Sequence, residues 1–165
     1  MSLIRPLDGR FWRILSLRWS HRPLSGDGAA RHGGRWNPPG KPALYLSMEV
    51  ETAFAEYQQE LGTRPGLFVA YDVEGATVAD LREAKAIRQA GLRMGDAFAP
   101  WKEIAWVRKE RPATWDAMER LEAGADGLLA PSMQRPGGFN LVLWRWNEAG
   151  GPTVRYHDPK EELRR

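Results

Sequence analysis

The chain has 165 residues, of which 42% are hydrophobic and 27% charged, and its formal net charge is +3. This composition excludes a disordered chain, and the length suits one domain over residues 1–165 with a continuous core. Cysteine is absent, which excludes disulfides, thiolate metal sites and cysteine nucleophiles. The sequence contains no polybasic run, so its charge does not indicate direct nucleic-acid binding.

Metal and membrane binding are not indicated either. The histidines, His21, His32 and His157, lack the i, i+3 or i, i+4 spacing of a helical metal site, so we expect no metal cofactor. The N-terminus has no signal-peptide core, and no apolar segment has the length that a bilayer requires. We therefore expect a cytoplasmic protein that does not bind membranes.

The first expected elements are a strand and a long loop. Residues 11–17 are predicted to form a strand, from which Arg13 could reach a ligand, although a solvated charge at a strand edge is the commoner case. Residues 20–40 are rich in glycine, proline and serine, and loops of this length in a compact domain are either functional or disordered. Two glycines and a double proline favour a stiff loop that presents three side chains to a ligand: Arg35, Trp36 and Asn37.

The best-defined helix is expected after a short strand at residues 43–46. Ser47 can cap this helix and Gly62 can end it. Its apolar residues recur at i, i+4, i+7 and i+11, which predicts a stripe facing the core: Val50, Phe54, Tyr57 and Leu61. Glu56 lies about 120° around the helix from that stripe, so helical geometry alone predicts a solvated surface acid.

The remaining elements are interleaved irregularly. Pro112 is expected to open a helix containing Trp115, Met118 and Leu121, and residues 96–107 are aromatic-rich and ambiguous. Further elements are expected as strands at residues 67–73, 76–81, 128–130, 140–146 and 153–157, and as helices at residues 82–91 and after Asp158. These elements predict an α+β domain with a central mixed, twisted sheet flanked by helices.

The polar residues suggest one kind of chemistry. Neither G-x-G-x-x-G nor G-x-x-x-x-G-K-[ST] occurs, so phosphate groups would be bound by other means, and a planar guanidinium such as that of Arg35 can bind them. A carboxylate on a helix, a tyrosine on a strand and serines at strand ends complete the set. Such groups can stabilise an oxocarbenium-like sugar when a glycosidic bond to a good leaving group breaks.

Several separated motifs resemble the RES-domain family. They are Gly-Arg-Trp-Asn-Pro-Pro-Gly at residues 34–40, Leu-Tyr-Leu-Ser at 44–47, a glutamate nine residues later, Gly-Leu-Leu-Ala-Pro-Ser at 127–132 and Asn-Leu-Val at 140–142. The family is named after Arg, Glu and Ser, which correspond here to Arg35, Glu56 and Ser132. The resemblance covers residues 11–146 and keeps the motifs in order.

The resemblance implies a fold similar to ADP-ribosyltransferase toxins and a role as the toxin of a bacterial toxin-antitoxin pair. NAD would be the co-substrate, cleaved by hydrolysis, by phosphorolysis or by ADP-ribosylation of a protein substrate, and an Xre-like antitoxin would be the partner. Arg35 would bind the diphosphate or adjacent ribose, and Tyr45 would stack on nicotinamide. Glu56 would be the catalytic carboxylate and Ser132 would orient the site, with Ser47 and Asn140 as weaker candidates.

Two other functions stay open at this point. The protein could be a nucleotide-binding module without catalysis, in which the Arg35 pocket only holds its ligand. It could also be a toxin ribonuclease that uses His32, Lys41 and Arg35 as its acid-base set.

Overall fold

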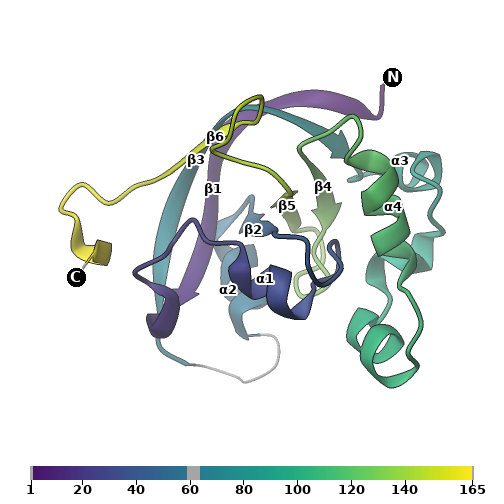
Figure 1. Cartoon of the computed structure of the whole chain (residues 1–165), viewed down its shortest axis with the longest axis horizontal. Helices are drawn as coiled ribbons and strands as arrows, with labels where there is room; N and C mark the ends of the chain where they lie inside the picture. Colours follow the sequence, from purple (N-terminus) through teal and green to yellow (C-terminus); the bar gives the residue numbers. More distant parts are fainter. Residues whose placement is uncertain (1, 59–63, 165) are drawn as a thin grey trace.

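The chain folds around a mixed six-stranded sheet that closes on itself. A computed structural model describes residues 2–58 and 64–164 (Figure 1). The strand order is β1-β2-β5-β4-β3-β6, and β1 also pairs with β3, so five strands form a barrel and β6 extends from β3. The strands are β1 (Ile4–Ser16), β2 (Leu44–Ser47), β3 (Gly66–Asp80), β4 (Gly127–Pro131), β5 (Phe139–Leu143) and β6 (Thr153–Tyr156). The expected mixed sheet is confirmed, but it is closed rather than open.

The strands β1 and β3 are much longer than the sequence predicts. They pair antiparallel from Ile4 opposite Ala79 to Ser16 opposite Gly66. The two strands expected at residues 67–73 and 76–81 are one strand, which continues through Gly75 at a φ of 73°. The Asp8 carboxylate accepts the Gly75 N–H at 2.6 Å, where the register of the pair shifts. This irregularity explains why the sequence pattern is interrupted there.

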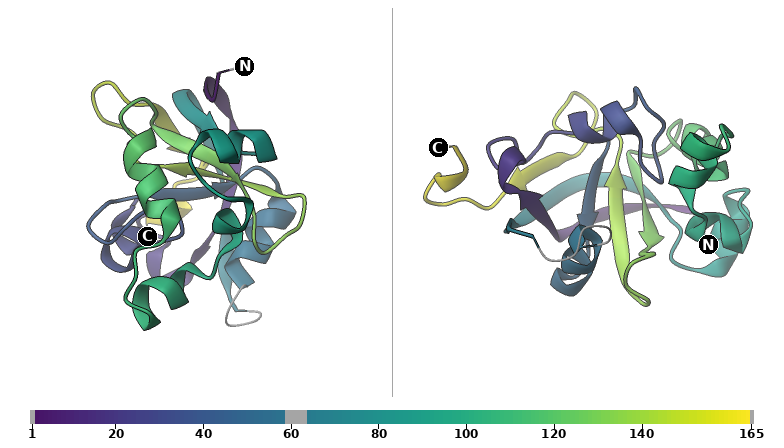
Figure 2. Two further views of the ribbon diagram at one scale, coloured as in Figure 1. Left: turned by 90° about the vertical axis from the view of Figure 1, so that its right-hand side faces the viewer. Right: turned by 90° about the horizontal axis from the view of Figure 1, so that it is seen from below.

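The helices lie on the outside of the barrel. They are α1 (Asp27–His32), α2 (Val50–Gln58), α3 (Ala84–Gln89) and α4 (Ala113–Leu121), together with a π-helical turn at Glu103–Val107 and 3-10 turns at Leu17–Trp19, Met94–Phe98 and Glu162–Arg164. Figure 2 shows α3 and α4 at one end of the molecule and the C-terminal turn at the other. Helix α1 lies in the stretch expected to be a loop. None of the described helices has the length and apolar character needed to cross a membrane.

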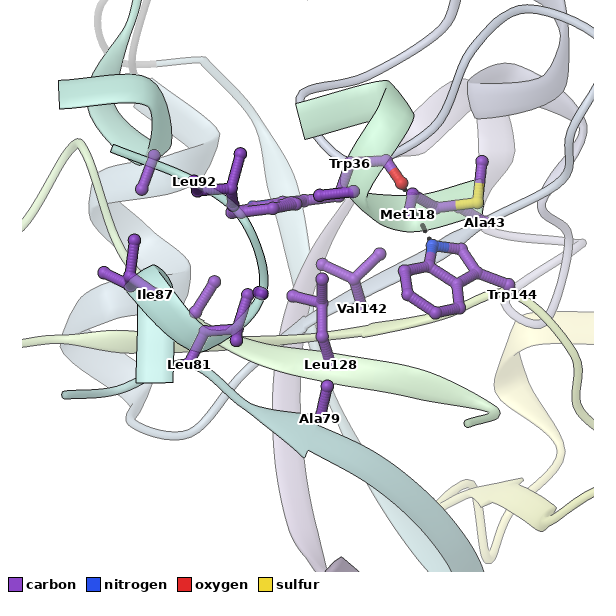
Figure 3. Close-up of a cluster of buried hydrophobic side chains, with 14 residues drawn as sticks. Trp36, Ala43, Ala79, Leu81, Ile87, Leu92, Met118, Leu128, Val142 and Trp144 are labelled. Atoms are coloured by element: carbon purple, nitrogen blue, oxygen red, sulfur yellow. Dashed lines mark hydrogen bonds between the residues drawn. The ribbon is translucent and has the colours of Figure 1, made fainter. Parts of the chain in front are cut away.

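Two apolar clusters form the core. One fills the barrel and takes residues from all its strands, with Tyr71, Leu44 and Leu141 fully buried. The other lies on the outer face of β4 and β5, beneath α3 and α4, and contains Trp36, Met118 and Trp144 (Figure 3). Because β4 alternates between the clusters at Leu128 and Leu129, both of its faces are buried.

Helix α2 packs with a face that its apolar stripe does not predict. Thr52 and Ala53 are buried, whereas the side chains of Val50 and Phe54 are 39% and 46% exposed. The predicted stripe is therefore wrong for these two residues. Phe54 instead stacks on the exposed Phe68 of β3, with ring centroids 6.5 Å apart. The expected stripe member Leu61 and the expected terminator Gly62 lie outside the described residues.

Candidate active site

The glycine-rich loop is held by hydrogen bonds from elements distant in the sequence. The Trp115 indole of α4 donates to the Gly34 carbonyl at 2.8 Å, and the Trp144 indole donates to the Trp36 carbonyl at 3.0 Å. The Thr114 hydroxyl donates to the Arg35 carbonyl. Three consecutive carbonyls therefore have fixed partners, and the loop conformation does not depend on a bound ligand.

Trp36 and Asn37 hold the loop rather than meet a ligand. The Trp36 side chain is only 3% exposed and belongs to the core (Figure 3). Asn37 is fully buried and donates to the carbonyls of Ala29 and Lys41 at 2.9 and 2.8 Å. The expectation that these two side chains are presented to a ligand is wrong. Asn37 is the donor that buried backbone carbonyls need, and Trp36 packs in the core beneath the loop.

Arg35 reaches the cavity from the glycine-rich loop. It lines the larger cavity of the molecule and donates to the Ala99 carbonyl. Burial lowers the pKa of its guanidinium, and the nearby charge of Glu56 and the phenol of Tyr45 oppose that shift. A partly buried guanidinium has lost part of its hydration, so it binds an anionic ligand more strongly than an exposed one does.

Glu56 lies in a hydrogen-bonded cluster that connects three elements. Its Oε1 accepts hydrogen bonds from the Ser132 hydroxyl and the Asn140 amide, both at 2.7 Å. The Ser47 hydroxyl donates to Asn140 Oδ1 at 2.9 Å, which orients the amide with its NH₂ group toward Glu56. Ser132 also accepts the backbone N–H groups of Gln134 and Arg135. The solvated position that helical geometry predicts for Glu56 is therefore wrong.

Ser47 also differs from one of its expected roles. It is the last residue of β2, its side chain is 4% exposed, and its hydroxyl bonds Asn140 across the sheet instead of capping α2. β2 pairs with β5 so that Ser47 lies opposite Asn140 and Tyr45 lies opposite Val142. This register brings the two weaker candidates, Ser47 and Asn140, into direct contact beside Glu56.

Tyr45 connects the cavity to the glycine-rich loop. Its hydroxyl donates to Asn37 Oδ1 at 2.6 Å and accepts the Trp36 N–H at 3.0 Å, and burial raises its pKa. Gly34 passes so close that a Cβ there would lie 2.4 Å from the Tyr45 hydroxyl oxygen. Tyr45 also lines the cavity beside Glu56, while its hydroxyl positions the loop.

The structure adds Arg13 to the residues that the sequence singles out. Arg13 is half-buried on β1 and lines the same cavity as Arg35, so its interpretation as a solvated charge is wrong. Burial lowers its pKa, and the phenol of Tyr71 opposes the shift; the pKa of Tyr71 is itself raised to about 12 by burial. No carboxylate among the described residues forms an ion pair with Arg13. Its neighbour on the inner side is the Tyr71 phenol instead.

Two cavities adjoin at this cluster. The larger has a volume of about 570 Å³, and its walls include the aromatic rings of Trp19, Trp101 and Trp106. The smaller has a volume of about 450 Å³ and lies toward α2. Both are lined by Arg13, Trp19, Tyr45, Glu56 and Asn140. The carboxylate of Glu56 thus lies between the two cavities, and guanidinium groups and aromatic rings form much of the wall of the larger one.

The residues of the ribonuclease hypothesis are not gathered in this way. His32 lines the larger cavity, but Lys41 forms an ion pair with Glu122 and lines neither chamber. Within the described part of the chain, no group of three or more His, Asp or Glu side chains could hold a metal ion. The polar centre of the cavity is therefore the Glu56 cluster with its arginines.

Comparison with known proteins identifies the family. A sequence model of the RES domain matches residues 10–165. The chain belongs to the RES-domain family. This confirms the resemblance carried by Arg35, Glu56 and Ser132, two of which, Glu56 and Ser132, are in direct contact here.

Relatives of this RES-domain chain are known in mycobacteria. The chain is 33% identical over 114 residues to the NAD(+) phosphorylase MbcT of Mycobacterium tuberculosis and of Mycobacterium bovis, and the match covers 59% of this chain and 61% of theirs. The crystal structure of the M. tuberculosis MbcT-MbcA toxin-antitoxin complex contains a similar chain, with a TM-score of 0.63 and 23% identity over 98% of this chain and 91% of that one. At this identity the structural likeness establishes the fold.

Proposed function

We propose that the protein cleaves NAD at the bond between nicotinamide and ribose. The observation that carries the proposal is Glu56, a carboxylate held at 2.7 Å by both Ser132 and Asn140 and facing a cavity lined by three arginines, which include Arg13 and Arg35. The family relatives named NAD(+) phosphorylase support the choice of substrate. The chemical groups along the cavity wall suit NAD, since they include cations for a diphosphate and aromatic rings for two flat bases.

Each side chain has a part in this chemistry. As the glycosidic bond breaks, its electron pair goes to the ring nitrogen of nicotinamide, and positive charge develops on the ribose. Glu56 stabilises that charge, and its neutral donors hold it in place without cancelling it. Arg35 and Arg13 bind the diphosphate, and the Tyr45 ring stacks on nicotinamide, which leaves as a neutral molecule.

We further propose that the protein is the toxin of a toxin-antitoxin pair. An enzyme that consumes NAD without control would harm its own cell, so a cognate Xre-like antitoxin should neutralise it. A fold shared with a toxin-antitoxin complex supports this. The buried Trp36 cannot anchor such a partner, whereas Trp106 and Met133, which are 48% and 50% exposed beside the larger cavity, can do so.

Incubation of the purified protein with NAD tests the enzymatic proposal. We expect stoichiometric loss of NAD and release of free nicotinamide, measured by liquid chromatography and mass spectrometry. A non-catalytic nucleotide-binding module would bind NAD and leave it intact. Ribonuclease activity that survives the loss of Glu56 and requires His32 would instead favour the ribonuclease hypothesis.

A further inference from the structure

Helix α2 has an apolar face that points away from the barrel. Thr52 and Ala53 pack inward, and the Glu56 carboxylate is held at the cavity by two hydrogen bonds. These inward contacts fix the rotation of the helix, so that Val50 and Phe54 are left 39% and 46% exposed. The two residues are four apart and therefore lie on one side of the helix. The helix that supplies the carboxylate thus presents an apolar stripe on its outer side.

A residue of β3 extends this apolar stripe. Phe68 is 52% exposed, and its ring stacks on the Phe54 ring with the centroids 6.5 Å apart and the planes within 5°. Together the two phenylalanines expose about the surface of one whole phenylalanine, roughly 150 to 250 Å². We call Val50, Phe54 and Phe68 the aromatic patch. Contiguous apolar residues of this kind differ from single exposed ones and mark a candidate interaction surface.

The aromatic patch has a cation at one end and a carboxylate at the other. The exposed Arg64 lies over the Tyr57 ring, 4.3 Å from its centroid, so the cation is at the end of the patch where α2 finishes. Glu51 is exposed in the first turn of α2, three residues before Phe54, and lies at the opposite end. Among the residues that the structure describes, neither Arg64 nor Glu51 forms an ion pair.

This order of charges fits a second copy of the same chain. In a dimer with two-fold symmetry, the residues at one end of a shared surface meet the residues at the other end of the partner's surface. An axis through the stacked phenylalanines would bring Arg64 of each copy to Glu51 of the other. The four rings would then lie between two ion pairs. The charges of the patch are therefore self-complementary, whereas like charges at both ends would repel a second copy.

The area of the patch indicates the strength of such a dimer. A standard interface buries about 800 Å² on each partner, and somewhat more than half of that area is apolar. The aromatic patch supplies only part of this apolar share, with the polar side chains of α2 around it as a rim. Interfaces below the standard size belong to weak, transient complexes. We therefore expect dissociation at protein concentrations on the order of 10 to 100 µM.

We propose that the aromatic patch, flanked by Arg64 and Glu51, is the interface of a weak homodimer with two-fold symmetry. Its formation requires neither NAD nor the charge of Glu56, so the dimer can be tested apart from the proposed enzymatic function. The residues proposed to anchor the antitoxin, Trp106 and Met133, are not part of the patch.

Sedimentation velocity over a concentration series measures the dimer. The mass of the wild type should rise from 18.7 kDa toward twice that value between about 1 and 200 µM. Phe68→Thr keeps a β-branched residue in the strand and removes the ring, so it should raise the dissociation constant by at least about tenfold. Val107→Thr is the matched control, because Val107 is 74% exposed on the π-helical turn outside the patch. Its mass curve should match that of the wild type.

An exchange of the two flanking charges tests the two-fold arrangement. Arg64→Glu alone and Glu51→Lys alone each set like charges against each other at two places, so each should raise the dissociation constant by about 3- to 10-fold. The double variant restores both ion pairs with their signs exchanged and should return the constant close to that of the wild type. Circular dichroism with thermal melting shows that each variant is folded. Nicotinamide release by Phe68→Thr should stay near wild type.

Several outcomes would overturn the homodimer. One is a wild type that stays monomeric at about 200 µM. Another is a dimer that persists in Phe68→Thr, or single charge reversals that the double variant does not correct, because a different surface would then hold the copies together. If the wild type is monomeric and the patch variants lose antitoxin binding, the patch serves the antitoxin and the homodimer is wrong. A wild type that dimerises but cleaves no NAD would overturn the proposed function alone.

Discussion

Arg35 is the cation through which the glycine-rich loop would meet NAD. We expect Arg35→Ala to raise the KM for NAD by about 10- to 100-fold, because it removes a charge-assisted hydrogen bond of about 1.5 to 3 kcal/mol. Arg35→Lys should restore part of this loss, since it keeps the charge without the planar fork. Steady-state kinetics with varied NAD measure both variants. Unchanged KM values in the two would remove Arg35 from the NAD site.

Ser47 should act on the reaction through Asn140. The Ser47 hydroxyl donates to Asn140 Oδ1, so Ser47→Ala removes a hydrogen bond that orients Asn140 and contributes about 0.5 to 1.5 kcal/mol. We therefore expect kcat/KM to fall by about 2- to 10-fold. In an Asn140→Ala background, the same change should have almost no further effect. A double-mutant cycle on nicotinamide release measures the coupling. Losses that simply add would show that Ser47 has a separate role.

At this scale the sequence identifies functional residues by motif better than by geometry. The family motifs indicate Arg35, Glu56 and Ser132, and the structure places the last two in contact. Helical periodicity gives the wrong side for Glu56 because it assumes that the largest apolar residues face the core. Thr52 and Ala53 face it instead, since small side chains allow close packing against the barrel. For Arg13, the interruption of an apolar strand allows a ligand contact but favours a solvated charge, so the sequence alone ranks the two roles in the wrong order.

The glycine-rich loop depends on the absence of a side chain at Gly34. A Cβ added at this position would lie 2.4 Å from the Tyr45 hydroxyl oxygen and 2.6 Å from Asn37 Oδ1. Gly34→Ala must therefore push apart the two groups that form this hydrogen bond. We expect a loss of about 1 to 3 kcal/mol in the free energy of unfolding.

Chemical denaturation of Gly34→Ala and Gly28→Ala measures this effect with a matched control. A Cβ at Gly28, in α1, meets nothing within 4 Å, so alanine there should leave stability unchanged or raise it by about 0.5 to 1 kcal/mol. Equal stability of Gly34→Ala and the wild type would contradict the account of the loop.

Among the elements, the sequence predicts β2, β4, β6 and α4 within a few residues, but it does not predict closure of the sheet. Closure requires β1 to pair with β3, and no local pattern records which distant strands pair. The strand expected at residues 11–17 begins at Ile4. Its first seven residues are mostly exposed and show no regular alternation of apolar and polar side chains, so the sequence pattern does not reveal them. Helix α1 has six residues inside a glycine-rich stretch, so it is too short for a periodic pattern to reveal it.

In its cell, the protein should cause growth arrest when no neutralising partner is present. Expression of the wild type alone should deplete cellular NAD and stop growth, and expression with the cognate antitoxin should restore both. Growth curves and NAD measurements on cell extracts report the result. Normal growth with normal NAD, in cells shown to contain folded protein, would contradict the toxin role. That residues 1–165 form one domain stays a prediction.

We propose that Glu56 supplies the negative charge that faces the developing oxocarbenium. Glu56→Gln keeps the shape and removes that charge, so kcat for nicotinamide release should fall by at least about 100-fold while NAD binding is largely retained. Glu51→Gln is the matched control, because Glu51 lies exposed in the same helix, whereas Glu49 accepts hydrogen bonds from Thr52 and Phe139.

Single-turnover measurement of nicotinamide release, with NAD affinity determined separately, tests this claim most directly. We predict that Glu56→Gln folds, binds NAD nearly as well as the wild type and releases nicotinamide at least about 100 times more slowly, with Glu51→Gln near wild type. A folded Glu56→Gln protein that binds NAD and releases nicotinamide at the wild-type rate would contradict it.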